Sequence, residues 1–137
     1  MIRVNSLSKK FNNLLAVDQV SFEVKQGEIL GFLGPNGAGK TTTMKMLTCF
    51  IPPSSGTAEI CGYSILDDPL QVRNQIGYLP ESAPSYEEML VGEFLKFIAE
   101  IRGYSGMELK RRVSMVIEKT SLSDVENQMI DTLSKGF

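Results

Sequence analysis

Apolar residues in the first third of the chain fall in short runs separated by turns. The runs at 2–7 and 20–24 predict strands, and the continuous apolar run at 29–33 predicts a buried strand. Apolar positions then recur at helical spacing over 40–50, and the prolines that follow at 52–53 end this helix. The pattern therefore predicts a strand, a glycine-rich loop and a helix in direct succession.

The middle of the chain continues with short elements. After a turn at Ser54-Ser55-Gly56, the sequence predicts strands around 57–61 and at 76–79. The acidic pair Asp67-Asp68 follows two apolar residues, which are too few to form a buried strand. Because Pro69 comes at once, we expect a polar turn here.

Beyond Pro84 the apolar spacing becomes helical. The first stripe predicts one helix, and Ser105 with Glu108 predicts a capping box at the start of a second helix. A third, shorter amphipathic segment follows. The three stripes are Val91, Phe94, Leu95, Ile98 and Ile101; Leu109, Val113, Val116 and Ile117; and Val125, Met129, Ile130 and Leu133.

Composition narrows the class of protein. The chain has 137 residues, of which 42% are hydrophobic, and this is enough for one domain with a core. A net charge of −2, with no basic block beyond 110–112, offers nucleic acid or an anionic membrane little to bind. Cys49 and Cys61 stand alone and the chain has no histidine, so we expect reduced thiols and no zinc site. No apolar run approaches the length of a membrane span.

The strongest chemical signal is GPNGAGKT at 34–41, which fits the pattern GxxxxGK[ST] between a predicted strand and a predicted helix. In such a loop, backbone N–H groups and the helix N-terminus bind phosphate oxygens, Lys40 reaches the β- and γ-phosphates, and the Thr41 hydroxyl ligates Mg²⁺. The predicted nucleotide-binding residues are Gly34, Pro35, Asn36, Gly37, Ala38, Gly39, Lys40, Thr41 and Thr42. We expect a side chain at Gly37 or Gly39 to block phosphate. A bare glycine turn is the competing interpretation, and a phosphate loop alone leaves GTPases, nucleotide kinases and many ATPases open.

Five motifs distinguish between these classes. They are LSKKFNNLLAVDQVSF, GEILGFLGPNGAGKTT, PPSSGTAEICGY, IGYLPE and LSKGF. In this order and at these intervals, the motifs resemble the nucleotide-binding subunit of an ABC transporter, and more narrowly the ATP-binding subunits of ABC-2-type exporters of the multidrug and gliding-motility group. The resemblance implies an incomplete α/β fold of the P-loop NTPase, ABC ATPase type. It would consist of an antiparallel β part and a partial parallel core with the P-loop at 1–86, and a helical subdomain at 87–137.

The resemblance also assigns residues outside the loop. It makes Phe11 the aromatic residue that stacks on adenine, normally a tyrosine. Without the resemblance, a core residue of an edge strand is the favoured interpretation of Phe11. Glu81 takes the place of the Q-loop glutamine, which implies that it is a second ligand of Mg²⁺ beside Thr41. Leu90 replaces the usual Thr or Ser cap of the first helix, so we expect that helix start to be less well satisfied.

The last motif, LSKGF, resembles the LSGGQ signature and departs from it at Lys135 and Phe137. In the family, the signature serine and glycine, here Ser134 and Gly136, contact the nucleotide of a partner subunit in a head-to-tail dimer. The Walker B strand, the D-loop and the switch histidine follow this motif in the family. We therefore expect the chain to be an N-terminal part of such a domain, and the absence of histidine agrees with this.

These residues together predict the ATP-binding subunit of an exporter with ATP and Mg²⁺ as cofactors. The parent would hydrolyse ATP to drive a separate membrane-spanning subunit, on the cytoplasmic face of the cell membrane. The 137 residues alone are expected to bind ATP without hydrolysing it. The alternatives are a nucleotide-binding interaction module without turnover and a part of a non-transport ABC ATPase.

Overall fold

The computed structural model describes residues 1–80 and 85–134. The chain divides into two compact units, Met1–Leu79 and Pro80–Phe137, and each is described by itself below.

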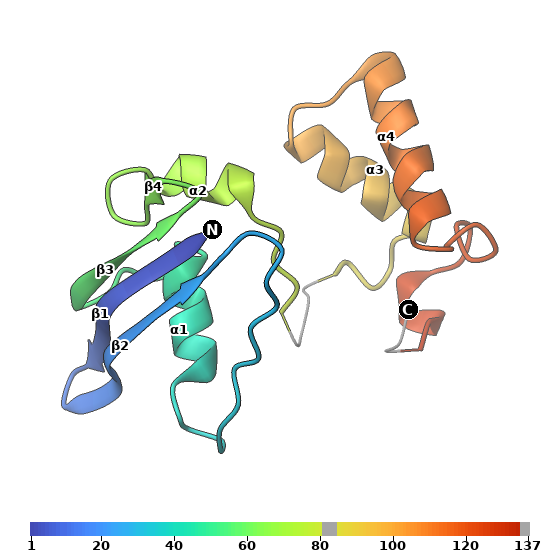
Figure 1. Cartoon of the computed structure of the whole chain (residues 1–137). Coiled ribbons are helices and arrows are strands. Elements are labelled where there is room, and N and C mark those ends of the chain that lie inside the picture. Colours follow the sequence, from blue (N-terminus) through green and yellow to red (C-terminus); the bar gives the residue numbers. More distant parts are fainter. Residues whose placement is uncertain (81–84, 135–137) are drawn as a thin grey trace. The chain divides into compact units, whose positions relative to one another are not determined.

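A four-stranded antiparallel sheet organises the first unit (Figure 1). Its strands are β1 (Ile2–Phe11), β2 (Leu14–Val24), β3 (Ser55–Ile60) and β4 (Tyr63–Ser64), in the order β2-β1-β3-β4. The strands expected at 2–7 and 20–24 are confirmed, and both extend to a tight hairpin at Asn12-Asn13. Asn12 accommodates the left-handed turn with φ 49°.

The core of the first unit forms where helix α1 (Lys40–Leu47) packs on this sheet (Figure 1). Residues on one face of the sheet meet the inward side of α1. On β1 these are Val4 and Leu7, which are three apart because an irregularity between them, with Ser6 at φ 47°, shifts the alternation. The buried members are Val4, Leu7, Val17, Met46, Leu47, Ala58, Ile60, Ile65 and Val72.

A second helix, α2 (Pro69–Gln75), and strand β4 were not expected from the sequence. The polar turn before α2 is confirmed, and the Ser64 hydroxyl donates to the Asp67 carboxylate (2.8 Å) inside it. Pro69 stands in the first turn of α2, where a missing N–H costs nothing. The proline therefore begins a helix here.

The predictions of strands at 29–33 and 76–79 are wrong. Both runs are without regular structure, and Ile29, Leu33 and Leu79 are 98%, 95% and 86% exposed. Within the described residues, neither run forms a ladder with another strand, and no hydrogen bond joins the two runs. An apolar run becomes a strand only when a second backbone takes up its N–H and C=O groups. Two side chains of these runs still reach the rest of the unit. The Phe32 ring lies edge-on to that of Phe22, with ring centroids 5.2 Å apart, and Ile76 packs against the buried core.

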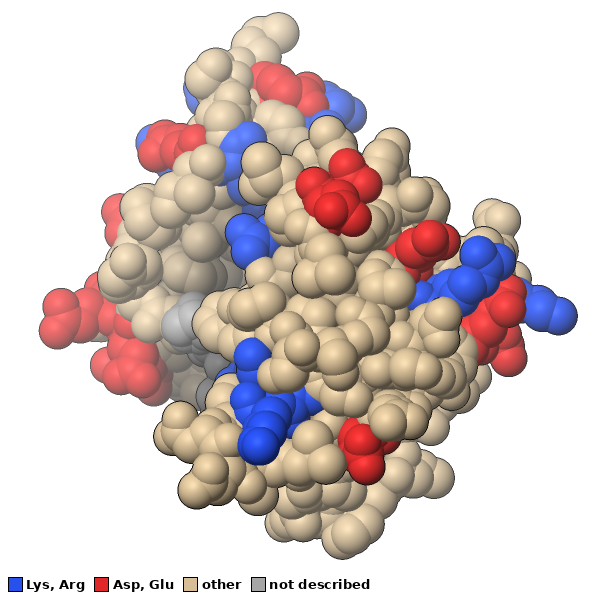
Figure 2. Space-filling model, turned by 90° about the vertical axis from the view of Figure 1, so that its left-hand side faces the viewer, with Lys and Arg blue, Asp and Glu red and all other residues tan. Residues whose placement is uncertain are grey.

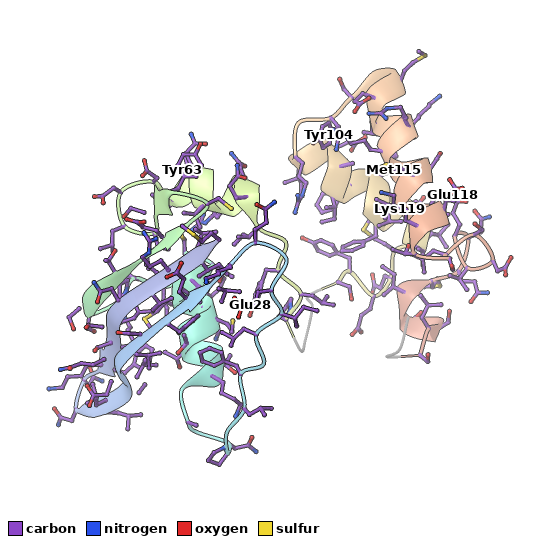
Figure 3. All side chains as sticks on the ribbon, viewed as in Figure 1. Glu28, Tyr63, Tyr104, Met115, Glu118 and Lys119 are labelled. Carbon is purple, nitrogen blue, oxygen red and sulfur yellow. The ribbon has the colours of Figure 1, made fainter. Side chains whose placement is uncertain are left out.

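The second unit contains the two helices predicted from apolar stripes, α3 (Val91–Ile101) and α4 (Gly106–Lys119). The expected capping box at α4 is wrong, because Ser105 makes no side-chain hydrogen bond at the helix start. Glu108 instead accepts hydrogen bonds at 2.8 Å from both Arg111 and Arg112. These two guanidinium groups lower the pKa of Glu108 to about 2. Tyr104 lies in the connection between the helices (Figure 3). The centroid of its ring is 4.3 Å from the Arg112 guanidinium carbon.

The start of α3 is satisfied by backbone from beyond α4. The N–H groups of Val91 and Gly92 donate to the carbonyl oxygens of Gln128 (3.0 Å) and Glu126 (2.9 Å). A Cβ atom on Gly92 would lie 2.9 Å from Glu126 Cγ, so glycine permits this close approach. The expectation that Leu90 leaves this helix poorly capped is therefore wrong, since main-chain carbonyls replace the missing side-chain cap.

The same pairing extends toward residue 131. The N–H groups of Ile130 and Asp131 donate to the carbonyl oxygens of Met89 (3.0 Å) and Glu87 (3.1 Å). The third amphipathic segment is thus a series of turns ending in a single 3₁₀ turn, Ile130–Thr132. In the part of the chain that the structure describes, no helix has the length and apolarity needed to cross a bilayer.

Candidate functional site

The glycine-rich loop at 34–39 connects the exposed run at 29–33 to α1. Gly37 and Gly39 have φ values of 85° and 83°, a backbone conformation that glycine adopts without steric cost. The Ala38 N–H donates to the Pro35 carbonyl oxygen (3.2 Å) and closes a turn within the loop. Residues 34–38 are exposed, so the loop presents its backbone to solvent.

The two inner glycines have different surroundings. A Cβ atom on Gly39 would lie 2.5 Å from the Ala16 carbonyl oxygen and 3.0 Å from Val17 Cγ2, whereas a Cβ atom on Gly37 would meet nothing within 4 Å. Gly39 therefore anchors the loop against β2, and Gly37 leaves the outer side of the loop open.

Lys40 is the first residue of α1, and its side chain extends over the glycine-rich loop. Its Nζ donates to the carbonyl oxygens of Gly34 (2.6 Å) and Pro35 (2.7 Å). The ammonium group is thus held by the first two residues of the loop. An ammonium in this position places a positive charge beside the exposed loop.

The N-terminus of α1 offers further donors. Its N-cap is Gly39, no side chain caps it, and no acidic residue stands in its first turn. The Thr43 hydroxyl donates a hydrogen bond to the Gly39 carbonyl oxygen (3.0 Å). In the described residues, the hydroxyls of Thr41 and Thr42 make no such hydrogen bond. Helix N–H groups, two free hydroxyls and one ammonium with no carboxylate among them fit a polyphosphate anion.

A divalent cation would depend on few protein ligands at this loop. No cluster of three His, Cys, Asp or Glu side chains forms within residues 1–80 and 85–134. Mg²⁺ is commonly held by one or two protein oxygens together with phosphate oxygens, and the Thr41 hydroxyl fits that role. Glu81, the other predicted ligand, lies outside the described residues.

Phe11 ends β1 and pairs with Leu14 across the hairpin. It is 44% exposed, more than a core residue of an edge strand would be. The hairpin joins Phe11 to the segment of β2 that carries Ala16, against which Gly39 packs. Phe11 and the glycine-rich loop therefore lie toward the same end of the first unit (Figure 1).

The predicted signature residues are only partly described. Ser134 is exposed at the end of the described chain, two residues after the 3₁₀ turn. Gly136 lies outside the described residues. The pairing of residues 87–92 with 126–131 determines where the chain leads toward Ser134.

The sequence analysis missed Lys9, whose Nζ lies 5.2 Å from the Phe11 ring centroid. Lys9 and Phe11 are two residues apart on one strand, a spacing that places both side chains on the same face. This spacing could have identified Lys9 from the sequence. Elsewhere, on the face displayed in Figure 2, acidic and basic side chains are interspersed in small groups. This agrees with the low net charge and offers no broad basic surface.

Comparison with known proteins places this chain in a family. The family model described as "ABC transporter" matches residues 17–137. The chain is 35% identical over 137 residues to a probable multidrug ABC transporter ATP-binding protein of Escherichia coli, YbhF. It is 37% identical over 137 residues to an uncharacterized ABC transporter ATP-binding protein of Bacillus subtilis, YxlF. All of the chain is covered in both cases, but only 24% and 45% of these relatives.

Solved structures agree with this assignment. One described as the ATP-binding subunit of an ABC transporter superposes with a TM-score of 0.80 at 32% identity, covering 99% of this chain and 57% of that one. A dimeric ATP-binding cassette in a post-hydrolysis state with ADP and Pi has a TM-score of 0.83 at 21% identity and covers 99% and 64%. The fold is therefore the expected P-loop NTPase fold of ABC ATPases. The chain belongs to the ABC transporter family, and its relatives there are ATP-binding proteins.

Proposed function

We propose that this chain binds Mg-ATP, with Gly34–Thr42 around the phosphates and Phe11 against adenine. The observation that carries the proposal is the Lys40 ammonium, held across a glycine-rich loop at the uncapped N-terminus of α1. Bound Mg²⁺ neutralises charge on the β- and γ-phosphates. Lys40 and the first N–H groups of α1 then hold the phosphates, and the Thr41 hydroxyl is one ligand of the ion.

The role of the whole protein is part of the same proposal. It would hydrolyse ATP and drive export through a separate membrane-spanning subunit on the cytoplasmic face of the cell membrane. Relatives called a probable multidrug ATP-binding protein and a linearmycin resistance ATP-binding protein support an export role. The dimeric state of one structural relative supports a second ATP-binding subunit as partner, which Ser134 and Gly136 would contact.

Calorimetric titration with Mg-ATP tests the phosphate site. We expect Lys40→Ala to bind at least ~10-fold more weakly, because it removes a charged donor to the phosphates. Lys45→Ala is the matched control, since it removes the same charge from the same helix, where Lys45 lies over the Phe50 ring. Glu81→Ala should cost less affinity than Lys40→Ala. Equal affinities of Lys40→Ala and the parent chain would disprove the phosphate assignment.

Turnover separates binding from catalysis. Lys40 and Thr41 hold the ground state as well as the transition state, so by themselves they favour binding over rate. We expect the 137-residue chain with Mg-ATP to release no more phosphate than its Lys40→Ala variant. Lys40-dependent release would show a catalytic carboxylate within these residues, and Glu81 and Asp67 would be tested first.

A further inference from the structure

The side chain of Lys9 connects two segments near the predicted adenine site. Its Nζ lies 5.2 Å from the centroid of the Phe11 ring, within the range of a cation–π contact. The same Nζ donates to the carbonyl oxygen of Pro52 (2.6 Å), which comes after α1 and far along the chain. The ammonium is therefore held from two sides, by a ring and by a main-chain oxygen.

The segment that holds Lys9 is itself fixed to β1. The Ser54 N–H donates to the Ser8 carbonyl oxygen (2.8 Å), and the Lys10 N–H donates to the Ser54 hydroxyl (3.0 Å). These hydrogen bonds on both sides of Lys9 prevent Pro52 from drifting away from the strand. The carbonyl oxygen that accepts from the Lys9 ammonium is thus held close to β1 by contacts that do not involve Phe11.

The contact restricts Phe11, which otherwise ends an exposed hairpin. An ammonium over one face of the ring occupies that face and orders the side chain before a ligand arrives. The remaining exposed surface of the ring is then available to a flat base. Ordering a side chain before binding reduces the entropy that binding would otherwise cost.

We propose that Lys9 is a positioning residue for nucleotide binding, which holds one face of Phe11 so that a purine base stacks on the other. The proposal rests on the proposed function, because it needs Phe11 to contact the base. It makes no use of a direct contact between Lys9 and phosphate.

The experiment compares two probes by calorimetry, Mg-ATP and Mg-triphosphate, which lacks the base. Lys9→Met keeps most of the side-chain volume and removes the charge, Lys9→Arg restores a cation over the ring, and Lys10→Met removes the neighbouring exposed charge as a control. We expect Lys9→Met to bind Mg-ATP about two- to five-fold more weakly, with Mg-triphosphate unchanged. Lys9→Arg and Lys10→Met should bind like the parent chain.

A Phe11→Ala background isolates the mechanism. There, Lys9→Met should cause no further loss of Mg-ATP affinity. Equal losses for Mg-ATP and Mg-triphosphate would show that Lys9 acts on phosphate or on folding, and this would overturn the proposal. The proposal would also be overturned if Lys9→Met lost the same Mg-ATP affinity in the Phe11→Ala background as in the parent chain. It would equally be overturned if Lys9→Met lost no Mg-ATP affinity in the parent chain. If Phe11→Ala is silent while Lys40→Ala weakens binding, this proposal fails and the phosphate site stands. If Lys40→Ala is also silent, the proposed function itself fails.

Discussion

The first unit contains two apolar regions that look alike in sequence and differ in structure. In β1 and β3, Val4, Leu7 and Ala58 are buried between the sheet and α1, whereas Ile29 and Leu33 in the run before the loop are almost fully exposed. Both regions have the residues of a strand. The difference is that β1 pairs on both sides, with β2 and β3, while the run at 29–33 has no ladder partner in the described residues. Burial in a sheet therefore follows pairing of the backbone as much as side-chain type.

Truncating one leucine in each region should give the largest contrast. Leu7→Ala removes a fully buried side chain and leaves a cavity, so we expect a loss of about 2–5 kcal/mol in the free energy of unfolding. Leu33→Ala removes an exposed side chain and should change it by less than about 0.5 kcal/mol. Urea unfolding followed by circular dichroism measures both. Similar losses would mean that Leu33 is buried in solution.

The two inner glycines of the loop provide the next contrast. Gly39→Ala places a Cβ atom against the Ala16 carbonyl in a left-handed backbone, so we expect a loss of about 3 kcal/mol in the free energy of unfolding. Gly37→Ala has the same backbone penalty without the clash and should lose about 1 kcal/mol. Thermal unfolding midpoints rank the two variants. The reverse ranking would contradict the packing of Gly39 on β2.

A charge added to the exposed run should make the chain less prone to associate. Unpaired apolar backbone is a template for pairing with another copy, and lysine opposes this. We expect Leu33→Lys to reduce light scattering at a given concentration. Gln71→Lys adds the same charge at an exposed position of α2 and is the control. Since a lysine brings the net charge of −2 closer to zero, equal improvement by both variants would show a general effect of lysine on solubility that is independent of the run.

The smallest effect on stability is expected in the second unit, at the exposed ion pairs of Glu108 with Arg111 and Arg112. Arg111 and Arg112 depress the pKa of Glu108 to about 2, so its contribution to stability is complete above its ordinary value of 4.5. That contribution is lost as pH falls through about 2. The urea midpoints of the parent and Glu108→Gln should therefore differ at pH 5 and converge near pH 2. Glu118→Gln, an exposed change on the same helix, should show no such convergence.

Local patterns predicted the elements whose partners lie close in sequence. The strands at 2–7 and 20–24 and the stripes of α3 and α4 were found because alternation and helical spacing are local signals. The runs at 29–33 and 76–79 were mispredicted because hydrophobicity does not reveal whether a second backbone is present. Helix α2 was missed because Pro69 suggested a break, although proline is favoured in a first turn.

The glycine-rich loop was predictable because its chemistry is contiguous in sequence, from Gly34 to Thr42. The contacts around Phe11 could not be predicted from the sequence. The Pro52 carbonyl oxygen comes near Lys9 only because α1 folds back on the sheet. The capping box predicted at Ser105 does not form, because Arg111 and Arg112 donate to the Glu108 carboxylate that would complete it. Motifs identify such residues but not which of several partners each will choose.

The backbone pairing of 87–92 with 126–131 also has a consequence for the order of folding. A helix of the length of α3 (11 residues) is marginal on its own in water. The carbonyl oxygens that accept from its first N–H groups come after the whole of α4 in the sequence. During synthesis the N-terminal part of a chain emerges first. We therefore expect the start of α3 to stay frayed during synthesis until residues 126–131 have emerged, and the helical unit to become cooperative only then.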